Sequence, residues 1–238
     1  MRVLAHLSDL HFGREDRASL EPLRRRLREL APDVVVVSGD LTQRARSRQF
    51  RAARAFLDTL PKPQLVVPGN HDVPLFNLFA RFLAPLGGYR RAIAADLEPS
   101  YVDDEIALLG INTARSFTWK TGAVSEKQLA RVRELARLDR AVKVLVTHHP
   151  LAHLVDCGID VLLAGHLHAT SVFFGKALMI QGGTATSSRT RDEPNSFNVL
   201  RVARPRIDVE QYVLSGAEFV RHARLSYARE NGGWIPIA

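Results

Sequence analysis

Five short motifs hold residues of the types that bind metal ions. They combine histidine with aspartate, asparagine and glycine: Asp9-Leu10-His11, Gly39-Asp40, Gly69-Asn70-His71-Asp72, His148-His149-Pro150 and Gly165-His166-Leu167-His168. The predicted metal ligands are Asp9, His11, Asp40, Asn70, His148, His166 and His168. Alternate residues of an extended chain point the same way, so we expect Asp9 with His11, and His166 with His168, to present two ligands to one side.

This set of ligands predicts a centre with two metal ions. Oxygen and nitrogen donors in this number, without a thiolate, exceed the needs of one ion but suit two ions that share the carboxylate of Asp40. Two divalent ions outweigh the negative charge of Asp9 and Asp40, so the pocket attracts phosphate oxygens. Manganese, iron, zinc and cobalt all accept such donors, and the metal identity stays open.

The motifs follow apolar runs that are typical of buried strands. Three such strands are expected at residues 3–5, 34–37 and 65–67, separated by amphipathic helices at residues 18–30 and 47–60. Further strands are expected at residues 106–111, 142–146 and 159–163, with a helix at residues 125–138. This alternation predicts an α/β structure whose polar residues gather where strands end.

The sequence changes in character after residue 168. Short apolar runs at residues 171–174, 178–181, 197–202 and 207–213 predict antiparallel strands, and residues 219–234 are interpreted as a final hairpin or an association surface. The phenylalanine-rich segment 74–99 is interpreted either as the rim of a site or as a helix packed on the sheet edge. A single domain over residues 1–238 is the simplest organisation.

Composition limits the class of protein. The single cysteine, Cys157, excludes a disulfide within the chain and favours a reducing cytoplasm. The start of the sequence does not resemble a signal peptide, and no apolar run reaches the roughly 18 residues of a transmembrane segment, so a cytoplasmic location is expected. A net charge of +8 suits a polyanionic partner, but the arginines at residues 24–28 lie among helically spaced leucines and are interpreted as a solvated face.

In this order and combination, the five motifs resemble the signature of the calcineurin-like metallophosphoesterase superfamily. The resemblance runs from residue 9 to residue 168. It implies a four-layer αββα fold, which is a mixed two-sheet β-sandwich flanked by helices. Strands at about residues 197–238 are expected to complete the second sheet. The same resemblance implies two groups of ligands with one shared member. Asp9, His11, Asp40 and His168 would hold the first metal, and Asp40, Asn70, His148 and His166 the second.

The resemblance also implies catalytic roles. His71 would stabilise the transferring phosphoryl group or protonate the leaving oxygen, with Asp72 orienting its ring. Many relatives have a second aspartate where this chain has Gln43, which argues against the protein-phosphatase branch. The first two motifs look more like the bacterial class III cyclic-nucleotide phosphodiesterases.

The leading hypothesis is a phosphodiesterase that hydrolyses small nucleotide phosphodiesters, 3',5'-cyclic ones among them, by attack of metal-bound hydroxide. A DNA-repair nuclease, a hydrolase of lipid-linked pyrophosphates and a scaffold without activity are the alternatives, and a homodimer is left open. Asn112, Arg115 and Lys120 follow a strand and are candidate substrate contacts.

Overall fold

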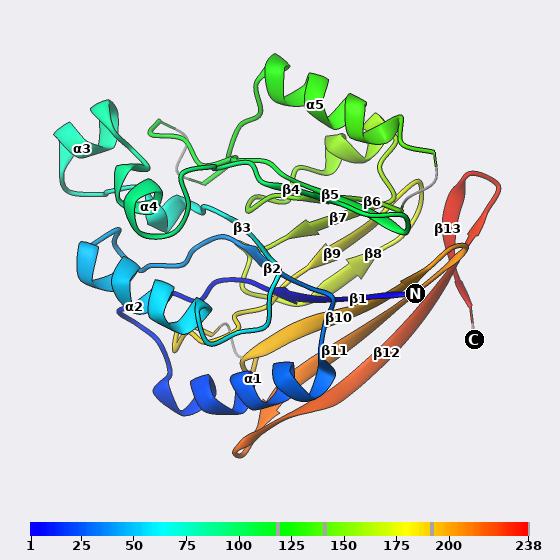
Figure 1. Ribbon diagram of the computed structural model, residues 1–238, viewed down its shortest axis with the longest axis horizontal. Coiled ribbons are helices and arrows are strands. Elements are labelled where there is room, and N and C mark those ends of the chain that lie inside the picture. The colour runs from blue at the N-terminus through cyan, green and yellow to red at the C-terminus, as the bar shows by residue number, and fades with distance from the viewer. Residues whose placement is uncertain (118–119, 140–141, 191–192, 238) are drawn as a thin grey trace.

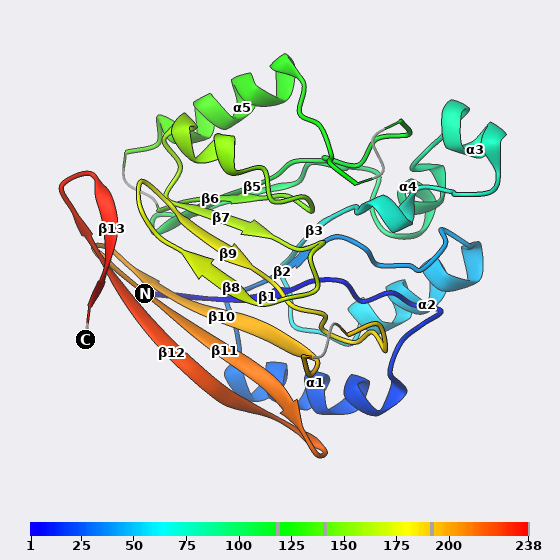
Figure 2. The same ribbon diagram turned by 180° about the vertical axis from the view of Figure 1, so that it is seen from behind.

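Two β-sheets pack face to face, with helices on the outer face of each, in the computed structural model, which describes residues 1–117, 120–139, 142–190 and 193–237 (Figure 1). Helices α1 (Arg17–Leu30) and α2 (Ser47–Leu57) cover one sheet, and α5 (Glu126–Ala136) covers the other, as the view from behind also shows (Figure 2). The predicted α/β fold of two mixed sheets flanked by helices is therefore confirmed.

The larger sheet has seven strands in the order β13-β12-β11-β10-β1-β2-β3. They are β1 (Arg2–Leu7), β2 (Val34–Ser38), β3 (Gln64–Val67), β10 (Ser196–Ala203), β11 (Arg206–Ser215), β12 (Glu218–Glu230) and β13 (Gly233–Ile237). Strands β1, β2 and β3 run parallel and end at the same edge, whereas β10 pairs antiparallel with β1 and starts an antiparallel meander.

The smaller sheet has six strands in the order β4-β5-β6-β7-β9-β8. They are β4 (Ser100–Val102), β5 (Ile106–Gly110), β6 (Val142–Val146), β7 (Val161–Ala164), β8 (Ser171–Phe173) and β9 (Leu178–Gln181). The four central strands are parallel and the edge strands β4 and β8 are antiparallel. The prediction of antiparallel pairing for β9 is therefore wrong where β9 pairs with β7, because those two strands are parallel.

The helices predicted at residues 18–30, 47–60 and 125–138 correspond to α1 (Arg17–Leu30), α2 (Ser47–Leu57) and α5 (Glu126–Ala136). The structure adds α3 (Leu78–Leu83), α4 (Gly87–Ala92) and the 3-10 helices η1 (Asn70–Asp72) and η2 (Ala152–Cys157). A side-chain cap starts α1, where Asp16 accepts from the backbone N–H of Ala18, and Ser125 caps α5. Within the described residues, no helix combines the length and apolarity needed to cross a bilayer.

Strands β1 and β2 are buried on both faces because neighbouring side chains alternate between two apolar layers. Leu4 and Val34 point into the layer between the sheets, whereas Ala5 and Val35 face α1 and α2. A third layer joins α5 to the outer face of the smaller sheet. The polar residues that follow these strands are thus attached to the most deeply packed part of the fold.

Two expectations about less regular segments need correction. The C-terminal strands do not complete the second sheet, because β10 pairs with β1 and so extends the sheet that opens the chain. Segment 74–99 forms α3 and α4: α4 packs against α2 and buries Tyr89, whose hydroxyl donates to the carbonyl of Val66 at 2.9 Å, whereas no residue of α3 is buried. Only the α4 half therefore behaves as a helix packed beside the sheet.

Candidate metal centre

The ends of five parallel strands bring the predicted ligands to one place between the two sheets. Strands β1, β2 and β3 lead into the first three motifs, and β6 and β7 of the other sheet lead into the last two. The side chains so gathered are almost fully buried: Asp9 0%, His11 0%, Asp40 1%, Asn70 2%, His148 0% and His168 8% exposed. Buried carboxylates and imidazoles in this number require partners of opposite charge or hydrogen-bonding partners.

One cluster of potential ligands consists of Asp9, His11, Asp40 and His168, whose ligand atoms lie within 4.8 Å of one another. The Nε2 atoms of His11 and His168 are 3.2 Å apart, and they lie 3.5 and 3.2 Å from Asp9 Oδ1. The other oxygen, Asp9 Oδ2, accepts from the Ser8 hydroxyl at 2.6 Å and from the backbone N–H of His166 at 3.1 Å. Asp9 Oδ1 is buried without a hydrogen-bond donor among the described residues, as expected for an atom that faces a cation.

A second cluster is built around Asn70. Its Oδ1 lies 3.0 Å from His148 Nε2 and 3.0 Å from His166 Nδ1. Asp40 joins the clusters, because its Oδ1 lies 3.4 Å from His148 Nε2 and its Oδ2 lies 3.6 Å from His11 Nε2. This is the arrangement that a bridging carboxylate requires.

Hydrogen bonds to backbone carbonyls fix two of the histidine rings. His148 Nδ1 donates to the carbonyl of Ser38 at 2.8 Å, and His168 Nδ1 donates to the carbonyl of Arg189 at 2.9 Å. The proton on Nδ1 leaves the lone pair on Nε2, which faces the cluster in both residues. Such outer bonds orient metal-binding histidines and set their tautomer.

The backbone at the ligands is not extended, which corrects one expectation. Asp9, His11, Asp40, His166 and His168 have φ values of 54°, 50°, 53°, 77° and 59°. In this left-handed region the side chains do not follow the alternation of a strand. His166 therefore faces Asn70 while His168 faces Asp9, and the two do not present their nitrogens to one cluster. Strained backbone of this kind gathers at functional sites.

Gly165 is required by a close approach of the two sheets. A Cβ atom at this position would lie 1.8 Å from Ser8 Oγ and 2.7 Å from Asp9 Oδ2. Gly69 is under a similar constraint, since its Cβ would lie 2.2 Å from Asp40 Oδ1. The glycines of the motifs therefore allow backbone to pass directly beside the carboxylates.

The charges of the cluster favour a bound cation. Burial alone would raise the pKa of Asp40, but the neighbouring His148 and His11 hold it far below its usual range. Burial likewise opposes the charged form of His148, yet the Asp40 carboxylate raises the pKa of that imidazole to about 9. Two buried carboxylates thus remain negative and draw positive charge to their neighbours, which is the demand that divalent ions satisfy.

His71 lies beside both clusters but Asp72 does not hold its ring, contrary to the expectation. The backbone N–H of His71 donates to Asp40 Oδ1 at 2.8 Å, and its Nδ1 donates to the carbonyl of Gln43 at 2.9 Å. Both oxygens of Asp72 accept instead from the backbone and hydroxyl groups of Thr42 and from the N–H groups of Leu41 and Gly69. Asp72 therefore joins the loop after β2 to the loop after β3 through hydrogen bonds. Gln43, not Asp72, orients the His71 ring.

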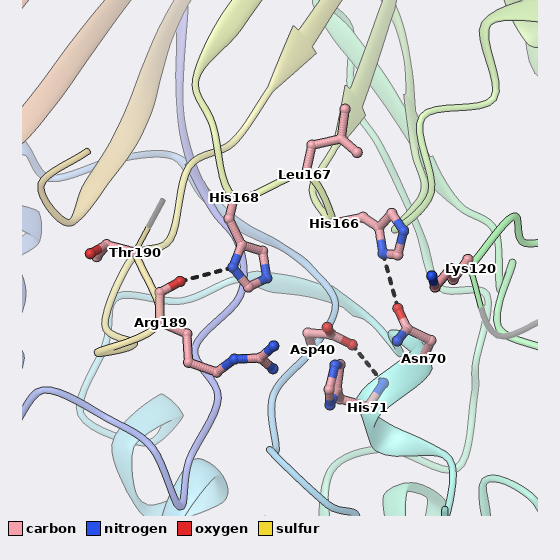
Figure 3. Close-up of a pocket in the computed structure, with 9 residues that line it drawn as sticks. All are labelled: Asp40, Asn70, His71, Lys120, His166, Leu167, His168, Arg189 and Thr190. Carbon is pink, nitrogen blue, oxygen red and sulfur yellow. Dashed lines mark hydrogen bonds between the residues drawn. The ribbon is translucent and has the colours of Figure 1, made fainter. Parts of the chain in front are cut away.

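A pocket of about 580 Å³ opens over the clusters (Figure 3). Sequence reasoning missed Arg189, whose guanidinium reaches toward His71 and lies 3.4 Å from Gln43 Oε1. Lys120 lies on the opposite side beside His166 (Figure 3). The lining residues are Asp40, Asn70, His71, Lys120, His166, Leu167, His168, Arg189 and Thr190.

Two of the candidate substrate contacts do not reach this pocket. The guanidinium of Arg115 donates to the carbonyls of Asn112 and Ala114 and to Gln128 Oε1, and the side chain of Asn112 accepts from the N–H of Ala114. Both residues therefore stabilise their own loop, and only Lys120 of that group lines the pocket. Residues 118–119 of the same loop lie outside the described residues.

The donor set fits two ions that prefer oxygen and nitrogen ligands. It offers two carboxylates, one amide oxygen and imidazole nitrogens, with one carboxylate oriented to both clusters. His149 lies beside the second cluster, since the ligand atoms of His148, His149 and His166 lie within 4.8 Å of one another. The two clusters thus form neighbouring candidate cation sites.

Comparison with known proteins identifies the family of this chain. The profile of the calcineurin-like phosphoesterases matches residues 2–170. The glycerophosphodiester phosphodiesterase GpdQ of Enterobacter lignolyticus (strain SCF1) is 38% identical over 100 residues, 35% of this chain and 34% of that protein. A transmembrane protein with metallophosphoesterase domain from Danio rerio is 30% identical over 185 residues, 71% of this chain and 41% of that protein. The chain thus spans less than half the length of either relative.

Solved structures share the fold at low identity. A dimetal phosphatase from Danio rerio superposes with a TM-score of 0.68 at 14% identity, over 92% of this chain and 98% of that one. The purple acid phosphatase PPD1 from yellow lupin seeds gives a TM-score of 0.71 at 14% identity, over 97% of this chain and 54% of that one. These likenesses establish the fold, and the chemistry has to be argued from the site.

Proposed function

The chain belongs to the calcineurin-like phosphoesterase family, and on that premise we propose that it is a dimetal-dependent phosphodiesterase for small phosphodiesters. Nucleotide diesters, 3',5'-cyclic ones among them, are the proposed substrates. The observation that carries this proposal is the Asp40 carboxylate, which lies with one oxygen toward each of two ligand clusters at the base of a pocket. Family membership and the GpdQ relative both support hydrolysis of a phosphoester.

Two groups of residues would hold the ions. Asp9, His11, Asp40 and His168 would bind the first, and Asp40, Asn70, His148 and His166 the second. Manganese, iron, zinc and cobalt remain the candidate metals for these ligands. When bound, a pair of such ions supplies Lewis acidity, which lowers the pKa of a water molecule and offsets the charge on the phosphate oxygens.

His71 is the proposed acid or phosphoryl-stabilising group. Its Nδ1–H donates to the carbonyl of Gln43, so a proton exchanged with the substrate would move through Nε2. Burial lowers the pKa of His71, which makes its protonated form a stronger acid toward a leaving alkoxide. The bond from its backbone N–H to Asp40 Oδ1 keeps this ring beside the shared carboxylate.

Arg189 and Lys120 would recognise the anionic part of the substrate. They line opposite sides of the pocket (Figure 3). A guanidinium donates two parallel hydrogen bonds to phosphate oxygens, whereas an ammonium acts as a point charge. The Arg189 side chain lies 3.4 Å from Gln43 Oε1, so Gln43 is proposed to position both this cation and His71.

The size of the pocket favours a small substrate over a nucleic acid. About 580 Å³ lies within the range of sites that enclose small ligands. The basic run on α1, which would have suited a polyanion, is engaged in ion pairs: Arg24 and Arg28 with Glu21, and Arg26 with Glu29. We therefore rank a small diester above DNA.

A substrate panel tests the proposal. The purified chain with added Mn²⁺ would be assayed on cyclic nucleotides, a linear dinucleotide, a glycerophosphodiester, phosphomonoesters, a pyrophosphate and single-stranded or duplex DNA. We expect kcat/KM for at least one small diester to exceed that for monoesters and DNA by tenfold or more. The Asp40→Asn variant, purified identically, guards against contaminating hydrolases. A tenfold preference for DNA would contradict the proposal and indicate a nuclease. A preference for pyrophosphate would indicate a pyrophosphatase.

A further inference from the structure

An unusual group of exposed apolar side chains surrounds α3. No residue of this helix is buried, and the Phe82 ring lies 5.1 Å from that of Phe117 in a separate loop. The six side chains, here called the α3 patch, are Phe76 (76% exposed), Leu78 (62%), Phe79 (81%), Phe82 (47%), Leu83 (80%) and Phe117 (86%). Large apolar side chains exposed together on one short helix and the loops beside it mark a site of contact.

Polar bonds, not burial, hold the patch in place. Asn77 caps α3 by accepting from the backbone N–H of Ala80 at 2.9 Å. The Arg81 guanidinium donates to the carbonyls of Pro74 and Ser116, and the Ser116 hydroxyl donates back to the carbonyl of Arg81 at 2.6 Å. The helix and the loop of Phe117 are thus fixed to each other while their apolar side chains point away from the protein.

The surface next to the patch is rich in arginine, and Asp58, which follows α2, pairs with Arg54 at 2.8 Å. Residues 73–95, which form α3 and α4, contain Arg81, Arg90 and Arg91 but no aspartate or glutamate. Residues 41–57, which lead into and form α2, contain five arginines and again no acidic residue. The two segments adjoin, because the Arg44 guanidinium lies 5.8 Å from the centre of the Phe76 ring and a groove between α2 and α3 is lined by both.

The patch lies at the same end of the molecule as the metal centre. Figure 1 and Figure 2 both show α3 projecting beyond α4 at the end where β3 leads into η1. Phe76 follows His71 by five residues, and Arg44 follows Gln43, the residue that orients the His71 ring. The patch thus lies at the end of the molecule that holds the metal centre, although none of its side chains lines the pocket.

We propose that the α3 patch docks on an anionic lipid surface, with its phenylalanine and leucine side chains in the interface and the arginines of α2 and α4 at the headgroups. Apolar side chains on one short element, flanked by basic residues, are the combination that binds anionic bilayers. The charge of the same face opposes a second copy of the chain as occupant, because a symmetric contact would bring two arginine-rich surfaces together. The inference concerns where the enzyme acts and does not depend on the substrate proposed above.

Vesicle binding tests the proposal with the full chain. Sedimentation with vesicles of mixed phosphatidylglycerol and phosphatidylcholine should carry the protein down, whereas phosphatidylcholine alone should not, and added salt should weaken binding. The double variant Phe79→Ser/Leu83→Ser should lower the partition coefficient at least tenfold. Phe173→Ser/Phe174→Ser removes two side chains of similar type, 55% and 56% exposed at β8, and should bind as the wild type does.

Each alternative has its own outcome. Absence of sedimentation with anionic vesicles at low salt would overturn the proposal, as would equal losses in both double variants. A dimer in light scattering that Phe79→Ser/Leu83→Ser converts to a monomer would assign the patch to self-association instead. Both variants should keep the wild-type far-ultraviolet circular dichroism and turnover of a soluble diester, because the substituted side chains are exposed and lie outside the pocket.

Discussion

The shared carboxylate makes a prediction that distinguishes one-metal from two-metal chemistry. Asp40 directs one oxygen to each cluster, at 3.4 Å from His148 Nε2 and 3.6 Å from His11 Nε2. Asp9 directs Oδ1 only to the first cluster, because its Oδ2 is occupied by the Ser8 hydroxyl and the His166 N–H. Asp40→Asn should therefore weaken the binding of both ions, whereas Asp9→Asn should weaken the binding of one.

The expected size of the effect follows from the charge that is lost. A unit negative charge about 4 Å from a divalent ion, at an effective dielectric constant of about 20, contributes about 8 kcal/mol of Coulomb attraction. The amide oxygen of asparagine and water ligands recover part of this. If about a third of this attraction is lost after that recovery, the dissociation constant rises by about 10²-fold for each ion that the carboxylate binds.

Metal content measured by inductively coupled plasma mass spectrometry gives the result directly. Protein loaded with Mn²⁺ and passed through a desalting column should hold two ions per chain as wild type, one as Asp9→Asn and none as Asp40→Asn. Asp208→Asn, which removes a buried carboxylate of β11 far from the centre, should retain both. A single ion retained by Asp40→Asn, or both ions lost from Asp9→Asn, would refute the bridging assignment.

Further predictions concern catalysis, backbone and pH. His71→Ala should keep both ions but lower kcat on an unactivated diester by about 10² to 10⁴-fold, and unchanged kcat in a steady-state assay would exclude its catalytic role. Gly165→Ala should abolish metal retention, because its Cβ has no room, whereas Gly87→Ala, whose Cβ would meet other atoms only at 3.3 Å or more, should retain it in the same metal assay. Burial opposes the charge of Asp208, but hydrogen bonds from Ser226 and the neighbouring arginines lower its pKa to about 2. The stability that its charge contributes is therefore present above about pH 4 and is lost as the pH falls toward 2. Asp208→Asn should thus lower the free energy of unfolding by about 1–2 kcal/mol at pH 7 and by little at pH 2 in urea titrations; a difference that persists at pH 2 would contradict this origin.

The place where the candidate metal ligands meet was predictable because local sequence and topology agree there. The valines of β2 and the Gly39-Asp40 pair that follows show where a buried strand ends, and parallel strands bring such ends to one edge. The contribution of Arg189 was not predictable in this way. It lies in a loop without a motif, and its place depends on a bond from His168, a residue 21 positions earlier in the chain.

Arg115 shows the opposite error. A polar loop residue after a strand is a reasonable candidate for contact with a substrate, but sequence cannot tell which carbonyls in the folded loop lack donors. In the structure the Arg115 guanidinium satisfies the carbonyls of Asn112 and Ala114. Buried carbonyls without a donor are costly, so this internal use of the arginine is favoured over exposure toward the pocket.

The left-handed backbone at the ligands has a cause that only the assembled sheets reveal. Each such residue costs about 1 kcal/mol or more relative to ordinary backbone. At β1 and β2 this cost is offset by hydrogen bonds between the motif loops, from Asp9 N to the carbonyl of Gly39 at 3.2 Å and from His11 N to the carbonyl of Asp40 at 2.9 Å. Because β1 lies between β10 and β2 and is buried on both faces, these loops have little freedom to relax. The same packing that stores the strain therefore holds the carboxylates together at the separation that a pair of cations requires.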